Sequence, residues 1–264
     1  MSNKLGFIGC GKMAKAIIKG VLASNSDIEI IASTSSSLSA QKAKEELNIN
    51  VVNDNKFVAN FADIIFIATK PNQVETVLNE IKDITNSQKL IVSVAAGVSI
   101  NKIQNIIGNL PIIRVMPNTP ALVNEGISAI AQGKFAIEEH LKKVKNILEN
   151  VGKVICVEES QIDVVTAISG SGPAFFYQIF EDMAQAGVKL GLEYDKSLLL
   201  AVQTALGSAK MTLQREKPLN DLIASVATKG GCTEVGINTM KDLNSEKFFS
   251  EIITKTTKKA HELG

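Results

Sequence analysis

The chain has 264 residues, of which 45% are hydrophobic and 21% charged, and its formal net charge is +1. Domains usually run to about 100–200 residues, so this length allows one large domain or two ordinary ones, each with a real core. The near-neutral balance, the lack of Trp and the two Tyr argue against a nucleic-acid partner, which would call for a basic surplus and stacking rings.

The number of cysteines and the N-terminal sequence indicate the cellular compartment that we expect. Cys10, Cys156 and Cys232 are far apart and form no CxxC pair. A sparse, odd count is typical of a reducing cytosol, and we expect no metal site. The first apolar run breaks at glycines too early for a signal peptide, and no apolar stretch reaches the ~20 residues of a membrane span. We therefore expect a cytoplasmic protein with no membrane partner.

Short β-branched runs alternate with helical patterns in the first part of the chain. Apolar strands separated by amphipathic helices predict right-handed βαβ crossovers and a parallel sheet with helices on both faces. We expect strands over residues 5–8, 28–32, 64–68, 90–94, 112–115 and 154–157, and helices over 12–22, 39–47, 73–81 and 99–107.

After about Glu159 the strand pattern ends and helical periodicity takes over. We expect helices over residues 173–190, 195–214 (with Asp195 as N-cap), 218–226 and 233–263. This shift predicts an α/β domain over 1–160 and an all-helical domain over 161–264. The helix over 173–190 is apolar around much of its circumference, which fits either a face buried against a second subunit or a central core helix.

A glycine-rich turn follows the first expected strand and opens the first expected helix. Gly9-Cys10-Gly11-Lys12-Met13-Ala14 has the G-x-G-x-x-A form, in which glycines permit a tight turn and the close approach of a pyrophosphate. The positive end of the helix dipole then faces the phosphates. The turn therefore predicts a Rossmann-type dinucleotide-binding domain; a turn without a ligand is the alternative.

The end of the second expected strand bears on which dinucleotide binds. Sites that prefer NAD place a carboxylate there to hold the ribose 2′-hydroxyl. Here Ala32 is followed by the hydroxyl-rich run Ser33-Thr34-Ser35-Ser36-Ser37, and Glu29 stands too early in the strand. The sequence favours NADP(H) and leaves NAD(H) open; a solvated polar loop is the alternative.

Ligands of open parallel sheets bind beyond the carboxyl ends of the strands. Three loops expected at that edge carry Lys70-Pro71, Ala95-Ala96-Gly97 and Asn118 between two prolines. His140 and His261 lie in none of them. Reduction of a ketone usually needs a general acid, whereas an iminium arrives already protonated. The pattern thus favours imine reduction.

Two glycine-rich turns precede expected helices in the second domain. They are Ser169-Gly170-Ser171-Gly172-Pro173 and Thr228-Lys229-Gly230-Gly231-Cys232-Thr233. Backbone N–H groups at such turns can hold a small carboxylate. Helix capping and close packing are the alternative explanation of each.

With these motifs in family order, the chain from Gly6 onward resembles the pyrroline-5-carboxylate reductases, which catalyse the last step of proline synthesis. The resemblance implies a Rossmann domain followed by a helical dimerisation domain, with dimers often assembled into decamers. The stretch over residues 218–241 is its most specific part.

The resemblance also implies site residues. Thr233 would lie near the ring nitrogen of 1-pyrroline-5-carboxylate, and the substrate would bind at Thr228, Gly230, Gly231, Cys232 and Thr233. The cofactor would bind at Ile8, Gly9, Cys10, Gly11, Lys12, Met13, Thr34, Ser36, Asn55, Thr69, Lys70, Pro71, Asn72, Ala95, Ala96 and Gly97.

One departure and two alternatives accompany this hypothesis. Family members commonly carry Ser-Pro-Gly-Gly where Thr228-Lys229-Gly230-Gly231 stands here, which removes a restraint on the turn and adds a charge. A β-hydroxyacid dehydrogenase would need a catalytic Lys, and Lys189, Lys196 and Lys210 sit in no matching motif. A non-enzymatic NADP(H)-sensing protein would have no need of a second anion-binding turn.

Overall fold

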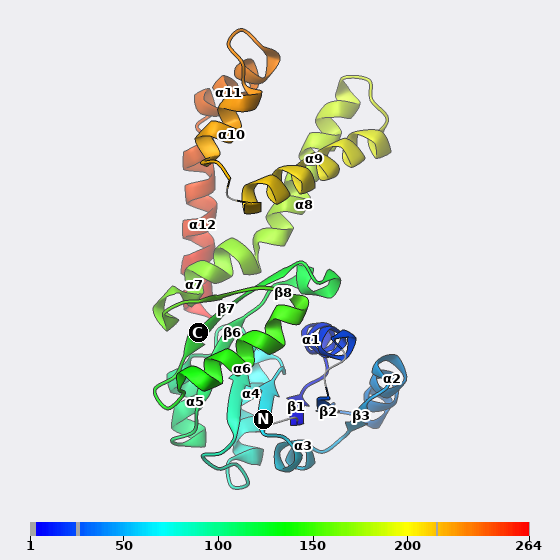
Figure 1. The fold of residues 1–264 in the computed structure, drawn as a ribbon, viewed down its shortest axis with the longest axis vertical. Coiled ribbons are helices and arrows are strands. Elements are labelled where there is room, and N and C mark those ends of the chain that lie inside the picture. The colour runs from blue at the N-terminus through cyan, green and yellow to red at the C-terminus, as the bar shows by residue number, and fades with distance from the viewer. Residues whose placement is uncertain (1–3, 25–26, 215, 264) are drawn as a thin grey trace. The chain divides into compact units, whose positions relative to one another are not determined.

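The computed structural model describes residues 4–24, 27–214 and 216–263 (Figure 1). The chain divides into two compact units. We call Met1–Ser171 with Thr256–Gly264 the sheet unit, and Gly172–Lys255 the helical unit. The division falls after Ser171, later in the chain than the boundary expected at residue 160.

The sheet unit is built on eight strands in the order β3-β2-β1-β4-β5-β6-β7-β8. Neighbouring strands are parallel except β6 and β7, which are antiparallel. The strand order reverses between β1 and β4, which is where such sheets bind their ligands. The strands are β1 (Lys4–Ile8), β2 (Glu29–Ser33), β3 (Asn50–Val52), β4 (Ile64–Ile67), β5 (Leu90–Ser93), β6 (Ile112–Met116), β7 (Gly126–Gln132) and β8 (Gly152–Cys156).

Helices connect these strands and make up the rest of the described chain. The α-helices are α1 (Lys12–Ala23), α2 (Ser37–Leu47), α3 (Asn55–Phe61), α4 (Pro71–Ile81), α5 (Ile100–Ile107), α6 (Glu138–Leu148), α7 (Ile162–Val165), α8 (Gly172–Lys189), α9 (Tyr194–Gln214), α10 (Leu219–Val226), α11 (Cys232–Asp242) and α12 (Ser245–Glu262). Shorter turns are the 3₁₀ segments Thr119–Val123, Glu149–Val151 and Glu159–Gln161 and the π-helical segment Thr166–Gly170.

The α/β fold predicted from the sequence is confirmed, with each expected strand and helix of the first part within two residues of its observed bounds. Two strands, β3 and β7, were not predicted. The single helix expected over 233–263 is wrong, because the chain breaks at Asn244, whose φ is +56°. Asp195 lies inside the first turn of α9 and is not its N-cap.

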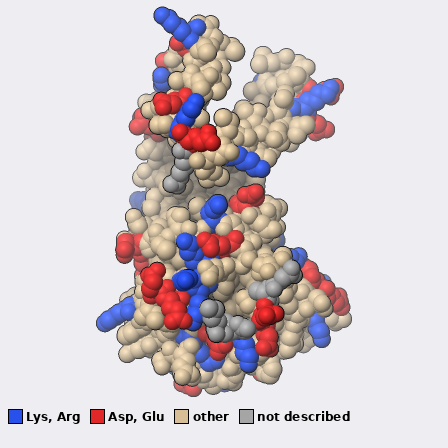
Figure 2. All heavy atoms as spheres, viewed as in Figure 1, with Lys and Arg blue, Asp and Glu red and all other residues tan. Residues whose placement is uncertain are grey.

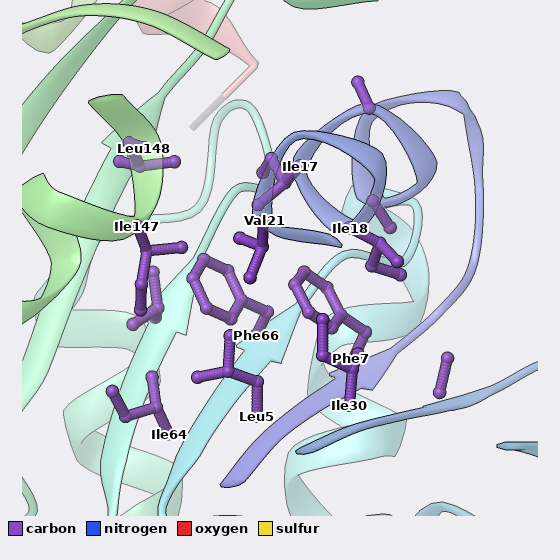
Figure 3. Close-up of a cluster of buried hydrophobic side chains, with 14 of the residues drawn as sticks. Leu5, Phe7, Ile17, Ile18, Val21, Ile30, Ile64, Phe66, Ile147 and Leu148 are labelled. Carbon is purple, nitrogen blue, oxygen red and sulfur yellow. The ribbon is translucent and has the colours of Figure 1, made fainter. Parts of the chain in front are cut away.

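Both faces of the sheet are buried, because helices cover each one. Alternate residues of a strand join different apolar clusters, as Phe7 and Ile8 do on β1. Figure 3 shows Ile17 and Val21 of α1 lying over the rings of Phe7 and Phe66. These two rings stack with centroids 4.6 Å apart. The central strands therefore hold their carboxyl ends in a fixed array.

The helical unit has few buried side chains of its own. Helices α8 and α9 pack against each other, and Ala184 and Ala201 are buried. Large apolar side chains on both helices stay exposed, and much of the unit's visible surface in Figure 2 is uncharged. They include Phe176, Tyr177, Met183, Leu199, Leu200, Leu206 and Met211. Within one chain, α8 is thus not a central core helix.

Candidate functional site

Gly9 makes the turn that follows β1. Its φ of +93° lies in the region that glycine favours, and a Cβ there would come within 2.8 Å of the Ala68 carbonyl group. Its N–H donates to the carbonyl oxygen of Ser33 at 3.1 Å. The turn therefore packs between the ends of β2 and β4, with no space for a larger residue.

The turn leads into the N-terminus of α1, with Gly11 as its N-cap. Among the described residues, no side chain caps this end, and the first turn holds no Asp or Glu. A Cβ on Gly11 would meet no atom within 4 Å. Uncapped N–H groups beside open space, at the positive end of a helix dipole, suit a phosphate.

A cavity of about 590 Å³ opens beside this turn. Four residues predicted to bind cofactor line it, namely Gly9, Thr34, Asn55 and Thr69. The hydroxyl oxygen of Thr69 is buried and, within the described part of the chain, has no hydrogen-bond partner. A buried hydroxyl of this kind requires a partner from a bound molecule or water. The cavity thus fits a ligand that carries polar groups.

The remaining predicted cofactor residues are not among those lining this cavity. Apart from Ser36, which follows β2, they lie at the carboxyl ends of β1, β4 and β5, which are neighbours in the sheet. Pro71 opens α4, and Lys70 is extended (ψ 149°), because a proline disfavours helical geometry in the residue before it. Ser36 caps α2 by accepting from the Ser39 N–H, and Lys12 lines a second cavity with Lys15 and Lys19.

Sequence reasoning missed a polar stripe on α4 that lines the same cavity. Gln73, Thr76, Val77 and Glu80 have the i, i+3, i+4, i+7 spacing of one helix face. That spacing was readable in the helix predicted over 73–81. Asn53, Asp54 and Lys56 were also missed, because they follow the unpredicted strand β3, and Ser35 completes the lining.

No carboxylate stands at the end of β2. Its last residue, Ser33, is fully buried, and Glu29 is its first. The Ser33 hydroxyl donates to Oδ1 of Asn55 at 2.6 Å, and Nδ2 of Asn55 donates to Oε2 of Glu80 at 2.6 Å. A hydrogen-bonded chain therefore runs from the end of β2 to α4.

The predicted substrate-binding residues lie at the N-terminus of α11 in the helical unit. Gly230 has a φ of +76°, and its N–H donates to Oε2 of Glu234 at 2.8 Å. The Gly231 N–H donates to the carbonyl oxygen of Thr228 at 2.9 Å. Cys232 and Thr233 form the first turn of the helix. This turn thus already binds one carboxylate, that of Glu234.

Asn118 and the two histidines make contacts within the sheet unit. Asn118 is buried, with Nδ2 donating to the Ser169 carbonyl oxygen at 3.2 Å and Oδ1 accepting from the Ile127 N–H at 2.9 Å. Nδ1 of His140 accepts from the Ile137 N–H at 3.1 Å and so caps α6, and burial lowers the pKa of His140. Nδ1 of His261 lies 3.1 Å from Oδ2 of Asp163.

Within residues 4–24, 27–214 and 216–263, no helix is long and apolar enough to cross a membrane. Nor do three or more His, Cys, Asp or Glu side chains gather there as they would around a metal ion.

The parallel sheet, its switch point and the Gly9 turn define a Rossmann-type dinucleotide-binding protein. Residues 159–263 match the pyrroline-5-carboxylate reductase dimerisation family, and residues 4–97 match a family described as NADP oxidoreductase, coenzyme F420-dependent. The pyrroline-5-carboxylate reductase of Methanosarcina acetivorans is 35% identical, over 100% of this chain and 98% of its own length.

Solved structures give the same result. A pyrroline-5-carboxylate reductase from Coxiella burnetii is 34% identical with a TM-score of 0.95, covering 100% of this chain and 98% of that one. The Plasmodium falciparum pyrroline carboxylate reductase, solved with NADP bound, is 32% identical with a TM-score of 0.87, covering 100% and 99%. The chain belongs to the pyrroline-5-carboxylate reductase family, and neither alternative drawn from the sequence is favoured.

Proposed function

We propose that this protein reduces 1-pyrroline-5-carboxylate to L-proline with a nicotinamide dinucleotide, as the final step of proline biosynthesis. The observation that carries the proposal is the full-length similarity to reductases of that name. The Gly9 turn with its cavity and the Gly230 turn with its carboxylate agree with it, since the reaction needs a dinucleotide and a carboxylate substrate.

The cofactor would bind along the carboxyl edge of the sheet. The N–H groups at the Gly9–Gly11 turn would hold the pyrophosphate. A polar group of the cofactor would form a hydrogen bond with the buried hydroxyl of Thr69. The Ser35 hydroxyl can donate to a 2′-phosphate, which supports NADP(H) as the preferred form. The Thr34 hydroxyl donates to the Ser36 carbonyl oxygen at 3.0 Å, so it would have to rotate away from that carbonyl to do the same. The NADP bound by the Plasmodium relative agrees with this preference.

The substrate carboxylate would bind at the N-terminus of α11. The Gly230 N–H already donates to a carboxylate, and the substrate would replace Glu234 as its acceptor. The hydroxyls of Thr228 and Thr233 would complete the site. Lys229, which stands where the family commonly has proline, adds a cation to this turn.

Catalysis would consist largely of orientation. When bound, the reduced nicotinamide supplies a hydride to the C=N carbon. An iminium substrate brings the nitrogen-bound proton with it, so no side chain has to deliver one. Thr233 would hold the ring nitrogen in position, and the two glycine turns would fix cofactor and substrate. Such positioning accounts for a large share of the barrier in reactions of two bound partners.

The protein self-associates, as the match to a dimerisation domain and the exposed apolar side chains of α8 indicate. We propose a dimer as the smallest assembly; the mass of the particle in solution distinguishes it from a decamer. We also propose a cytoplasmic location, which the sparse, odd number of cysteines supports.

The experiment that tests this function mixes the purified protein with NADPH and 1-pyrroline-5-carboxylate and follows absorbance at the nicotinamide band. We expect a decrease that depends on both substrate and protein. If neither NADPH nor NADH is oxidised when substrate is present, the proposed function is wrong.

A further inference from the structure

A carboxylate from α4 reaches the cofactor cavity beside the end of β2. Glu80 lines the cavity that also contains Thr34 and Ser35. Only the side chain of Asn55 separates its Oε2 atom from Ser33, the last residue of β2, through two hydrogen bonds of 2.6 Å. Glu80 therefore lies close to the end of β2, where proteins of this fold usually bind the ribose of the cofactor.

The end of β2 is the position at which Rossmann domains distinguish the two dinucleotides. A carboxylate there accepts a hydrogen bond from a ribose 2′-hydroxyl and repels a 2′-phosphate. This chain has Ser33 at that position. We infer that Glu80 supplies a carboxylate to this site from α4, and that by favouring an unphosphorylated ribose it reduces the preference for NADP(H) over NAD(H). The inference rests on the cofactor site proposed above.

The hydrogen bonds leave part of Glu80 available for this role. A carboxylate only accepts, so the Asn55 amide must direct Nδ2 toward Glu80 and Oδ1 toward the Ser33 hydroxyl. This contact uses Oε2, whereas Oε1 of Glu80 makes no hydrogen bond within residues 4–24, 27–214 and 216–263. A ribose hydroxyl can donate to that free oxygen.

Two other charged residues line the cavity, and they affect the binding of a 2′-phosphate differently from Glu80. Asp54 accepts from the Phe57 N–H at 3.0 Å and caps α3, so that its carboxylate is already engaged. Lys56 is a cation that attracts a 2′-phosphate. Because Glu80 and Lys56 line the same cavity, the site accepts both dinucleotides. The negative charge of Glu80 limits the preference of the site for NADP(H).

The test is a pair of binding titrations by calorimetry, with NADP⁺ and NAD⁺, on the wild type, Glu80→Gln and Glu75→Gln. Glutamine keeps an acceptor for Asn55 and removes the charge. Glu75 is on the same helix but lines a different cavity, so its variant has the same charge change elsewhere. We expect the NADP⁺/NAD⁺ affinity ratio of Glu80→Gln to rise about five- to tenfold, and that of Glu75→Gln to change less than about twofold.

The outcomes separate the possible failures. An unchanged or lower ratio in Glu80→Gln overturns the inference, since it would mean that Glu80 only holds Asn55. An equal rise in Glu75→Gln also overturns it, because the effect would then be one of overall charge. A wild type that binds neither dinucleotide contradicts the proposed cofactor site itself. Thermal melts check that both variants are folded.

Discussion

Gly9 and Gly11 stand two positions apart in one motif, yet the fold makes different demands on them. Gly9 combines a positive φ with a close approach to Ala68, whereas a Cβ on Gly11 would point into open space. The fold thus requires a glycine at position 9, whereas none of its contacts requires one at position 11, which agrees with the proposal that a ligand occupies that space. Both were predicted from the motif, but only the contacts show which role belongs to which glycine.

Substituting each glycine tests this difference. Gly9→Ala should lower the free energy of unfolding by about 2–3 kcal/mol through strain and collision. Gly11→Ala should leave it within about 0.5 kcal/mol and weaken dinucleotide binding. Urea denaturation and binding titrations measure both quantities. Equal destabilisation by the two variants would contradict the assignment.

Thr233 lies in the first turn of α11, where a hydroxyl can reach a substrate held by the preceding turn. Thr233→Ala should fold and bind cofactor normally but lose about 10- to 1,000-fold in turnover, the range of one polar catalytic contact. Thr239→Ala, farther along the same helix, is the matched control. Turnover equal to that of the wild type would remove Thr233 from the mechanism.

At the scale of elements, the sequence predicted helices and strands wherever their apolar period was regular. It failed at β7, whose sequence GISAIAQ mixes small and polar residues, and at β3, which has three residues. It failed again at Asn244, because a single residue in the left-handed conformation leaves no trace in helical periodicity. The face of α4 that lines the cavity could be recognised in the predicted helix, but the residues opposite it follow β3, so the sequence did not show that the two line one cavity.

Helices α1 and α2 are linked by ion pairs. Glu46 accepts from Lys15 and, at 2.6 Å, from Lys19, and these hydrogen bonds lower the pKa of Glu46 to about 2. Because the folded-state pKa lies below the ordinary value of 4.5, the stabilisation is complete above about pH 4.5 and disappears as the pH falls toward 2.

Removing this carboxylate tests the link. Glu46→Gln should lower the free energy of unfolding by up to about 1 kcal/mol at pH 7, since the pairs are solvent-exposed, and by much less at pH 2. Glu45→Gln, which removes a neighbouring charge that makes no ion pair among the described residues, should have a smaller effect. Urea denaturation at the two pH values measures the difference. A loss of the same size at both pH values would show that the ion pairs are not its cause.

At the scale of the whole molecule, the apolar circumference of the helix over 173–190 left two explanations open. Phe176 is 57% exposed and Tyr177 62% exposed within one chain, which favours burial against a second copy. Sequence periodicity could not decide this, because it reports how many faces are apolar and not what covers them. The glycine-rich turn over residues 228–233 can be recognised in the sequence, but the hydrogen bond between its Gly230 N–H and Glu234 depends on side-chain geometry.

A charge on the exposed face of α8 should disrupt self-association. Phe176→Glu would place a carboxylate in an apolar interface, where an unpaired charge is costly. We expect the mass measured by sedimentation equilibrium to fall toward that of a single chain. Lys196→Glu, at an exposed polar position of α9, should leave the mass unchanged. A Phe176→Glu variant with the wild-type mass would place the interface elsewhere.

The central claim is hydride transfer to the C=N carbon of 1-pyrroline-5-carboxylate, and isotope labelling tests it most directly. The enzyme would be supplied with NADPH deuterated at the transferred position of the nicotinamide, and the proline formed would be analysed by mass spectrometry and NMR. We expect one deuterium, on the ring carbon that was double-bonded to nitrogen. Proline without deuterium at that carbon, or no proline, would contradict it.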